Sequence, residues 1–258
     1  MIFDWLRKFN LFRREEPTLA SFGRTDTGRV RANNEDSFAI LADRNIFLVA
    51  DGMGGHNSGE VASRVAIETL VSYFSKSALR SMRGNREHIH HFMVSALRRA
   101  NEEVMLLAST DKTNHGMGCT LVAAFIDGDI MHTCHVGDAR CYRSNGNSLE
   151  QITTDHTLLA KTEAQDPTTG EVRKISRHVV TRAIGFPFQE DPEYHTVDLS
   201  ADAKVLLCSD GLWSMVNDAR LYGIMEESES PERATDIMVR EANDAGGKDN
   251  ITAVVVYR

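Results

Sequence analysis

Four aspartates in this chain lie beside short apolar segments. Three of them follow such a segment within two residues, and the fourth precedes one in the mirror arrangement. They are Asp51, Asp138, Asp210 and Asp249. Because the ends of strands present side chains to a shared cleft, we expect the four carboxylates to lie close together.

Converging carboxylates repel one another unless a cation lies between them. Mg²⁺ and Mn²⁺ suit such a cleft, since these hard cations prefer oxygen ligands and retain water. Gly52 follows Asp51, and a glycine lets the backbone come close enough for its carbonyl to act as a further ligand. The simpler alternative is a set of turn aspartates, which are common after strands. Their recurrence in one context favours a site for a pair of divalent cations.

A polar segment upstream, residues 29–36, could complete such a site. Arg31 offers two parallel hydrogen bonds to a phosphate group. Glu35 or Asp36 could orient a metal-bound water. Taken alone, the segment would be an ordinary polar turn, so its functional interpretation depends on the metal site.

These residues need a frame of strands and helices to hold them. Apolar runs predict strands over residues 46–50, 121–126, 130–136, 205–208 and 251–256. Apolar side chains at helical spacing predict helices over 61–74 and 89–104, and a third helix that begins at Ser230-Pro231 and ends at Gly246-Gly247. Asp127-Gly128 is typical of a hairpin turn between two of the strands.

Residues 162–180 interrupt this alternation of elements. They are polar and have no clear periodicity, so we expect a loop. Long loops inside a compact domain are usually functional or mobile.

Composition narrows the class of protein. The chain has 258 residues, 41% of them hydrophobic, which suffices for one large domain or two small ones. Its net charge of −8 argues against a nucleic-acid partner, because phosphate contacts need clustered lysine and arginine. No segment predicts a membrane span or a signal peptide, and the four cysteines form no C-x-x-C pair. We therefore expect a cytoplasmic, monomeric protein with reduced, buried thiols.

Residues 1–20 differ from the rest of the chain. Ile2, Trp5, Leu6 and Phe9 recur at helical spacing among basic residues, which is typical of a short amphipathic helix. Such a helix could contact a membrane surface or a partner. The alternative, which we favour, is an extension folded onto its own domain or partly disordered, since a helix this short is marginal alone.

Beyond these patterns, the chain from Ser21 to Arg258 resembles the metal-dependent protein phosphatase family, also called protein phosphatase 2C-like, in its bacterial form. The resemblance rests on the order and spacing of seven short motifs. They are Arg31-x-x-Asn34-Glu35-Asp36, Asp51-Gly52-Met53-Gly54-Gly55-His56, Gly116-Met117-Gly118-Cys119-Thr120, His135-Val136-Gly137-Asp138-Ala139-Arg140, Thr181-Arg182-Ala183-Ile184-Gly185, Ser209-Asp210-Gly211-Leu212 and Gly247-Lys248-Asp249-Asn250-Ile251-Thr252.

The resemblance implies an α+β fold. Two antiparallel sheets would pack face to face with helices outside both, giving a four-layer α-β-β-α sandwich with the metal site at one end. Residues 21–258 would form the phosphatase domain, and the segment at about 162–180 would be the family's mobile flap beside the site.

The resemblance also implies a set of metal ligands. Asp51 would bridge two Mn²⁺ or Mg²⁺ ions, and the Gly52 carbonyl would bind the first of them. Asp210 and Asp249 would bind the second ion. Asp138 would bind a third, weaker ion found in bacterial members.

Other site residues follow in the same way. Glu35 and Asp36 match positions that hold metal-bound water, and Arg31 matches the arginine that binds phosphate. The chain departs from animal members at Met53, where a histidine often protonates the leaving alkoxide. His56 or a metal-bound water would then donate that proton, and we expect water to do so.

The implied activity is hydrolysis of phosphoserine and phosphothreonine in proteins by a metal-activated water, without a phosphoenzyme. A bacterial Ser/Thr kinase, or the targets of that kinase, would supply the substrates. Two alternatives remain at this point: an inactive module that senses phosphate on the same fold, and a metal-dependent phosphodiesterase that acts on small molecules.

Overall fold

The computed structural model of this chain describes residues 19–55, 58–110, 112–144, 146–165 and 172–258. The predicted extension at residues 1–20 lies almost wholly outside the described residues, and so does His56. Among the described residues, no helix is both long enough and apolar enough to span a bilayer.

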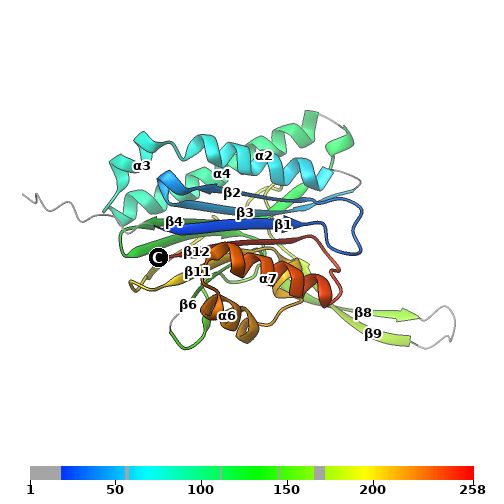
Figure 1. Cartoon of the computed structure of the whole chain (residues 1–258). Helices are drawn as coiled ribbons and strands as arrows, with labels where there is room; N and C mark the ends of the chain where they lie inside the picture. Colours follow the sequence, from blue (N-terminus) through cyan, green and yellow to red (C-terminus); the bar gives the residue numbers. More distant parts are fainter. Residues whose placement is uncertain (1–18, 56–57, 111, 145, 166–171) are drawn as a thin grey trace, which may run out of the picture.

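Two five-stranded sheets form the centre of the molecule (Figure 1). The first sheet has the strand order β1 (Ala20–Asp26), β12 (Ile251–Tyr257), β11 (Lys204–Cys208), β6 (Arg140–Ser144) and β7 (Leu149–Gln151). The second has the order β10 (Glu193–Asp198), β5 (Ile130–Val136), β4 (Gly118–Asp127), β3 (Ile46–Met53) and β2 (Asp36–Leu41). All pairings within the two sheets are antiparallel.

Helices cover the outer face of each sheet (Figure 1). The second sheet carries α2 (Ser58–Tyr73) and α4 (Arg86–Thr110), with α3 (Lys76–Met82) between them in the chain. The first sheet carries α6 (Asp218–Glu227) and α7 (Pro231–Asp244), preceded by the short α5 (Asp210–Trp213). Two 3-10 turns, Ala42–Arg44 and Lys112–Asn114, complete the described helical segments. The predicted α-β-β-α sandwich is confirmed.

Burial on both faces explains the continuous apolar runs of the central strands. In β3, Phe47 and Val49 face the core between the two sheets, whereas Leu48 and Ala50 face the core beneath α2 and α4. A strand covered on both sides needs apolar residues at every position, so the usual alternation disappears. The same division holds in β12, where Val254 lies between the sheets.

Local signals set the ends of several elements. The Ser230 side chain accepts a hydrogen bond from the backbone of Arg233 at 3.2 Å, and Pro231 occupies the first helical position of α7. Gly128 has a φ of 62° in the turn between β4 and β5, as the Asp-Gly pair predicts. The predicted third helix and the predicted hairpin are both confirmed.

The expected loop at residues 162–180 was wrong in its secondary structure. Two antiparallel strands, β8 (Thr157–Gln165) and β9 (Val172–Val180), form a separate hairpin that projects from the body of the molecule (Figure 1). A projecting hairpin needs no apolar face to match a core, and therefore its sequence lacks the alternation that identifies a core strand.

Candidate active site

A cavity of about 310 Å³ lies where β3, β5 and β11 end and β12 begins. The acidic cavity, as we call it, is lined by Arg31, Glu35, Asp51, Gly52, Met53, Gly54, Thr120, Asp138, Val180, Asp210 and Asp249. The structure therefore brings together all four aspartates that the sequence singles out, together with Arg31 and Glu35.

Strand alternation explains why these side chains meet. Phe47 and Val49 point between the sheets, and two residues further along β3 the same alternation places Asp51 at the end of that space. Asp51 was expected to follow its strand, but β3 continues to Met53 because its backbone still pairs with β4 beyond the apolar run. Thr120, which lies directly opposite Asp51 on β4, enters the cavity for the same reason.

Gly52 fixes the position of Glu35 against β3. The Gly52 amide donates to the Glu35 carbonyl at 3.1 Å. A Cβ atom at Gly52 would lie 2.3 Å from the carbonyl oxygen of Gly59 and 2.4 Å from that of Glu35. No side chain fits there, so the backbone of Glu35, Gly52 and the start of α2 can approach one another only with glycine at this position.

Asp36 lies behind the cavity rather than in its lining. Its Oδ2 atom accepts hydrogen bonds from the Ser209 hydroxyl at 2.7 Å and from the Thr252 hydroxyl at 2.6 Å. Asp36 pairs with Asp51 across β2 and β3, and only 8% of it is exposed. The carboxylate of Asp36 thus joins the ends of both sheets. Ser209 and Thr252 belong to the motifs quoted from the sequence, but the sequence assigned neither residue a role.

Asn250 ties the start of β12 to the segment before β2. Its side-chain amide donates to the carbonyls of Asn33 at 2.8 Å and Thr27 at 3.0 Å, while its side-chain oxygen accepts from the Glu35 amide at 2.8 Å. This residue, which the sequence placed in a motif without a role, holds the Glu35 backbone beside the neighbouring Asp249. Arg31 reaches the same place, since its guanidinium donates to Asp249 Oδ2 at 2.7 Å.

Burial and crowding perturb two of the aspartates in the acidic cavity. Burial, and then the charges of Asp36, Asp210 and Asp249, raise the pKa of Asp51 well above its ordinary value. Burial and the neighbouring Asp249 and Asp138 raise the pKa of Asp210 to about 7. The Oδ1 atoms of Asp36 and Asp210 are buried and have no hydrogen-bond partner among the described residues. Such groups fit divalent cations, which would supply the missing positive charge.

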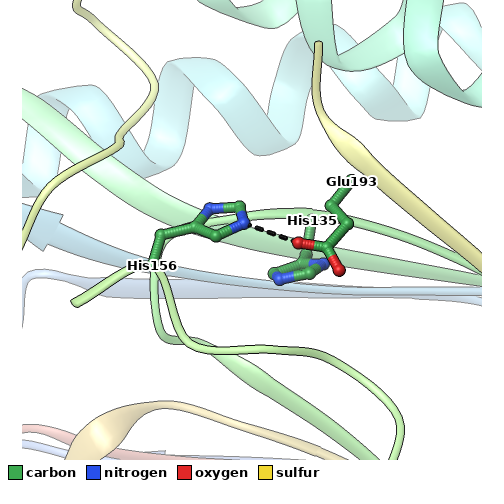
Figure 2. A group of neighbouring side chains, drawn as sticks. All are labelled: His135, His156 and Glu193. Atoms are coloured by element: carbon green, nitrogen blue, oxygen red, sulfur yellow. Dashed lines mark hydrogen bonds and ion pairs between the residues drawn. The ribbon is translucent and has the colours of Figure 1, made fainter. Parts of the chain in front are cut away.

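A second group of potential metal ligands lies close by and was not predicted. Ring nitrogens of His135 and His156 and a carboxylate oxygen of Glu193 lie within 4.8 Å of one another (Figure 2). We call these three residues the histidine cluster. His135 is on β5, three residues before Asp138, and Glu193 begins β10. The three residues come from separate segments without a shared motif, so their sequence spacing gives no signal.

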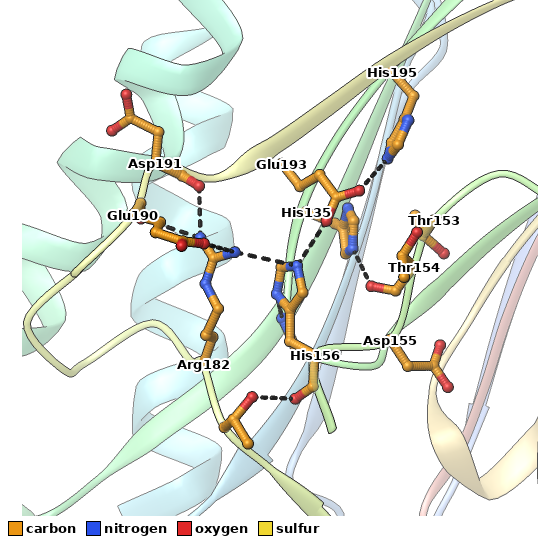
Figure 3. Close-up of polar contacts among 12 residues, drawn as sticks. His135, Thr153, Thr154, Asp155, His156, Arg182, Glu190, Asp191, Glu193 and His195 are labelled. Atoms are coloured by element: carbon orange, nitrogen blue, oxygen red, sulfur yellow. Dashed lines mark hydrogen bonds and ion pairs between the residues drawn. The ribbon is translucent and has the colours of Figure 1, made fainter. Parts of the chain in front are cut away.

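Hydrogen bonding decides whether the histidine cluster can hold a metal. His156 Nδ1 accepts from the Gly137 amide at 3.1 Å, so the ring proton must be on Nε2, which donates to Glu193 Oε2 at 2.9 Å. A protonated nitrogen cannot bind a metal, and a ligating histidine would instead donate from its other nitrogen. The cationic guanidinium of Arg182 also lies 3.3 Å from His156 Nε2 (Figure 3).

The Glu193 carboxylate of the histidine cluster has histidine partners for both of its oxygens. Burial lowers the pKa of His135 to about 4, and its Nε2 atom lies 2.9 Å from the Thr154 carbonyl. Burial opposes ionisation of Glu193, but the hydrogen bond from His156 and the neighbouring histidines hold its pKa below the ordinary value. His195 Nε2 lies 2.8 Å from the second oxygen of Glu193. His135 Nδ1 is buried without a hydrogen-bond partner among the described residues, but the proton on His156 Nε2 and the nearby Arg182 guanidinium favour a polar network over a metal site.

Comparison with known proteins identifies the family to which this chain belongs. A family model described as protein phosphatase 2C matches residues 27–244. The chain belongs to the protein phosphatase 2C family. Its serine/threonine phosphatase relative stp from Listeria welshimeri is 32% identical over 244 residues, covering 91% of this chain and 94% of the relative. Protein phosphatase PhpP from Streptococcus pneumoniae is 33% identical over 239 residues, covering 90% and 94%.

A solved structure of this family shows metals as well. The catalytic domain of the serine/threonine protein phosphatase PstP in complex with two manganese ions superposes with a TM-score of 0.75 at 29% identity, covering 93% of this chain and 97% of that one. The family, the fold, the phosphatase activity and the divalent metal dependence predicted from the sequence are therefore confirmed. The roles of individual residues remain predictions.

Proposed function

We propose that this protein phosphatase hydrolyses phosphoserine and phosphothreonine in protein substrates at the acidic cavity, with two divalent cations held by Asp51, Asp210 and Asp249. The Gly52 carbonyl completes the ligand set, and Asp138 holds a third, weaker ion. The observation that carries the proposal is the convergence of four aspartates in one cavity, where burial and mutual repulsion raise the pKa of Asp51 and Asp210. When bound, the cations supply an activated water nucleophile and neutralise charge on the phosphoryl group.

The remaining residues of the cavity bind and orient. Arg31, whose side chain is 46% exposed, can turn its free nitrogens toward a phosphate while it stays paired with Asp249. Glu35 lines the cavity on a backbone fixed by Gly52 and Asn250, so its carboxylate is placed to accept a proton from an incoming water. Asp36 positions the ends of β11 and β12 through Ser209 and Thr252.

A water nucleophile agrees with the lining of the cavity. The described lining residues include no serine or cysteine, and Met53 offers no proton to a leaving group. Cys119 lies next to Thr120, but burial and then the charge of Asp51 raise the pKa of its thiol, which keeps it protonated. His56, the other candidate proton donor, lies outside the described residues. As expected from the sequence, we propose water as the donor.

The substrates that we propose are phosphoproteins of a bacterial Ser/Thr kinase pathway, the cognate kinase or its targets, because the relatives are bacterial serine/threonine phosphatases. The deciding experiment measures phosphate release from phosphothreonine peptides with Mn²⁺, Mg²⁺ or excess EDTA, and compares it with release from cyclic and diester substrates. Turnover of diesters but not of phosphopeptides would contradict the proposal, and so would turnover that persists in chelator at verified zero metal content.

A further inference from the structure

A second cavity, of about 570 Å³, adjoins the acidic cavity. It is lined by residues 180–183 and 186–190 together with Met53. Met53 and Val180 also line the acidic cavity, so the two cavities lie side by side. A polypeptide whose phosphorylated residue occupies the acidic cavity would therefore pass along this second space, which we call the flanking cavity.

One wall of the flanking cavity is apolar and open to solvent. Phe186, Pro187 and Phe188 form this wall, and Phe186 is 41% exposed. Phe188 by contrast packs partly against the core beneath α2 and α4. An exposed aromatic residue in a concave site is the kind of group that dominates binding energy in recognition surfaces.

The apolar wall is held in place by Asn101 on α4. Its side-chain oxygen accepts from the Gly185 amide at 2.6 Å, and its side-chain nitrogen donates to the Phe186 carbonyl at 3.1 Å. Gly185 has a φ of 98°, a conformation that favours glycine. The Phe186 ring also covers Gly118, where an added Cβ would lie 2.6 Å from the ring. The binding surface is thus preformed, which reduces the entropy lost on binding.

Arg182 closes the loop that carries this wall (Figure 3). One guanidinium nitrogen donates to the carbonyls of Glu190 at 3.0 Å and Asp191 at 2.5 Å, and a second lies 3.3 Å from His156 Nε2. The Glu190 side chain is 79% exposed at the rim, and its carboxylate lies 3.5 Å from Arg182. With these charges paired, the apolar wall favours an apolar side chain in the flanking cavity.

We infer that the flanking cavity binds an aliphatic or aromatic side chain of the substrate, close in sequence to the phosphorylated residue, because the two cavities share Met53 and Val180. The inference rests on the proposed function of the acidic cavity. It assigns to Phe186 a role in selecting among phosphoprotein substrates.

The test uses phosphothreonine peptides in which Phe, Leu, Ala or Asp is placed in turn at each of the neighbouring positions. We expect Phe or Leu at one position to raise kcat/KM at least about fivefold over Ala, from burial of its apolar surface, and Asp there to lower it. Phe186→Ala should reduce the ratio of Phe to Ala peptide to below about twofold, whereas Phe186→Leu should retain most of it. Leu106→Ala is the matched control, since Leu106 is another exposed apolar residue, 59% exposed on α4.

Cross-linking locates the side chain without relying on turnover. A phosphopeptide with benzoylphenylalanine at the favoured position should cross-link to residues 180–190, as identified by mass spectrometry. Cross-links elsewhere, or an unchanged ratio in Phe186→Ala, would overturn the inference. A lack of metal-dependent phosphate release from every peptide would instead contradict the proposed function, and the cross-linking result would still decide the role of the flanking cavity.

Discussion

The acidic cavity and the histidine cluster are neighbours built from residue types that bind metals, yet their protein environments are opposite. Asp138 and His135 are three residues apart in the chain. In the acidic cavity and directly behind it, one buried oxygen each of Asp210 and Asp36 has no hydrogen-bond partner among the described residues. In the histidine cluster, both oxygens of Glu193 lie within 2.9 Å of histidine nitrogens. The difference teaches that unmet charge, more than proximity of ligand types, identifies a metal site.

The largest effect is expected when the central ligand of the acidic cavity is removed. Asp51→Asn should lower turnover of a phosphothreonine peptide by at least about 10³-fold, because metal ions contribute several kcal/mol of transition-state stabilisation. Titration calorimetry should show the loss of Mn²⁺ binding in this variant. Glu193→Gln, from the histidine cluster, is the matched control and should keep the full metal stoichiometry. Normal Mn²⁺ binding by Asp51→Asn would break the comparison.

Metal-free protein should lose stability as the pH rises. Burial raises the pKa of Asp36 to about 6 and that of Asp210 to about 7. Both groups therefore favour the folded state while they are protonated, and this stability is lost as the pH passes through the folded values. In excess EDTA, the free energy of unfolding should fall by roughly 2–4 kcal/mol from pH 5 to pH 8. Urea unfolding measures this, and Mn²⁺ should remove most of the slope. A free energy of unfolding that does not change with pH in EDTA would mean that the protein itself compensates the charge of these carboxylates.

A smaller effect is expected in the histidine cluster. His156→Ala should lower the free energy of unfolding by about 1–3 kcal/mol, because the Gly137 amide and Glu193 lose buried hydrogen bonds. Glu193→Gln should have a milder effect of the same sign. Zn²⁺ titration of the native protein should show no site that disappears in Glu193→Gln. A one-to-one Zn²⁺ site that this variant abolishes would show that the cluster binds metal after all.

The smallest effect concerns the cysteines, all four of which are buried. Cys119 lies closest to the acidic cavity, opposite Gly52 in the pairing of β3 with β4. Cys119→Ala should change kcat by less than about threefold, because a buried, protonated thiol is neither ligand nor nucleophile. Cys141→Ala, which lies between the sheets, is the control. Rapid labelling of Cys119 by a thiol reagent in the native protein would contradict this view.

The acidic cavity could be predicted from the sequence more readily than the histidine cluster. Each aspartate of the acidic cavity lies beside its own apolar strand, so local sequence was enough to single it out. The partners of Asp36 were harder to find, because Ser209 and Thr252 meet it only when the two sheets stack. Strand alternation is the signal that would have found them, since both lie on inward-facing positions. His156 and Glu193 carry no such signal. Their contact depends on how the segments before β8 and before β10 run, which strand alternation does not reveal.

The hairpin of β8 and β9 was missed for a different reason. Strand prediction depends on alternation imposed by a core, and a projecting hairpin has no core to match. The polar composition of residues 162–180 therefore indicated a loop, although its backbone pairs regularly over nine residue pairs.

Hydrogen bonds join the two ends of that hairpin at its base. The Thr181 amide and hydroxyl both donate to the His156 carbonyl, at 2.8 Å and 2.9 Å, and the His156 amide donates to the Gly137 carbonyl at 3.0 Å. Entry and exit of the hairpin are thus joined at one point beside Asp138. We therefore expect changes of length or sequence between residues 160 and 179 to leave Asp138 in place. The hairpin can therefore vary in sequence independently of the acidic cavity. Such variation would change substrate specificity while the catalytic end of the sandwich stays the same.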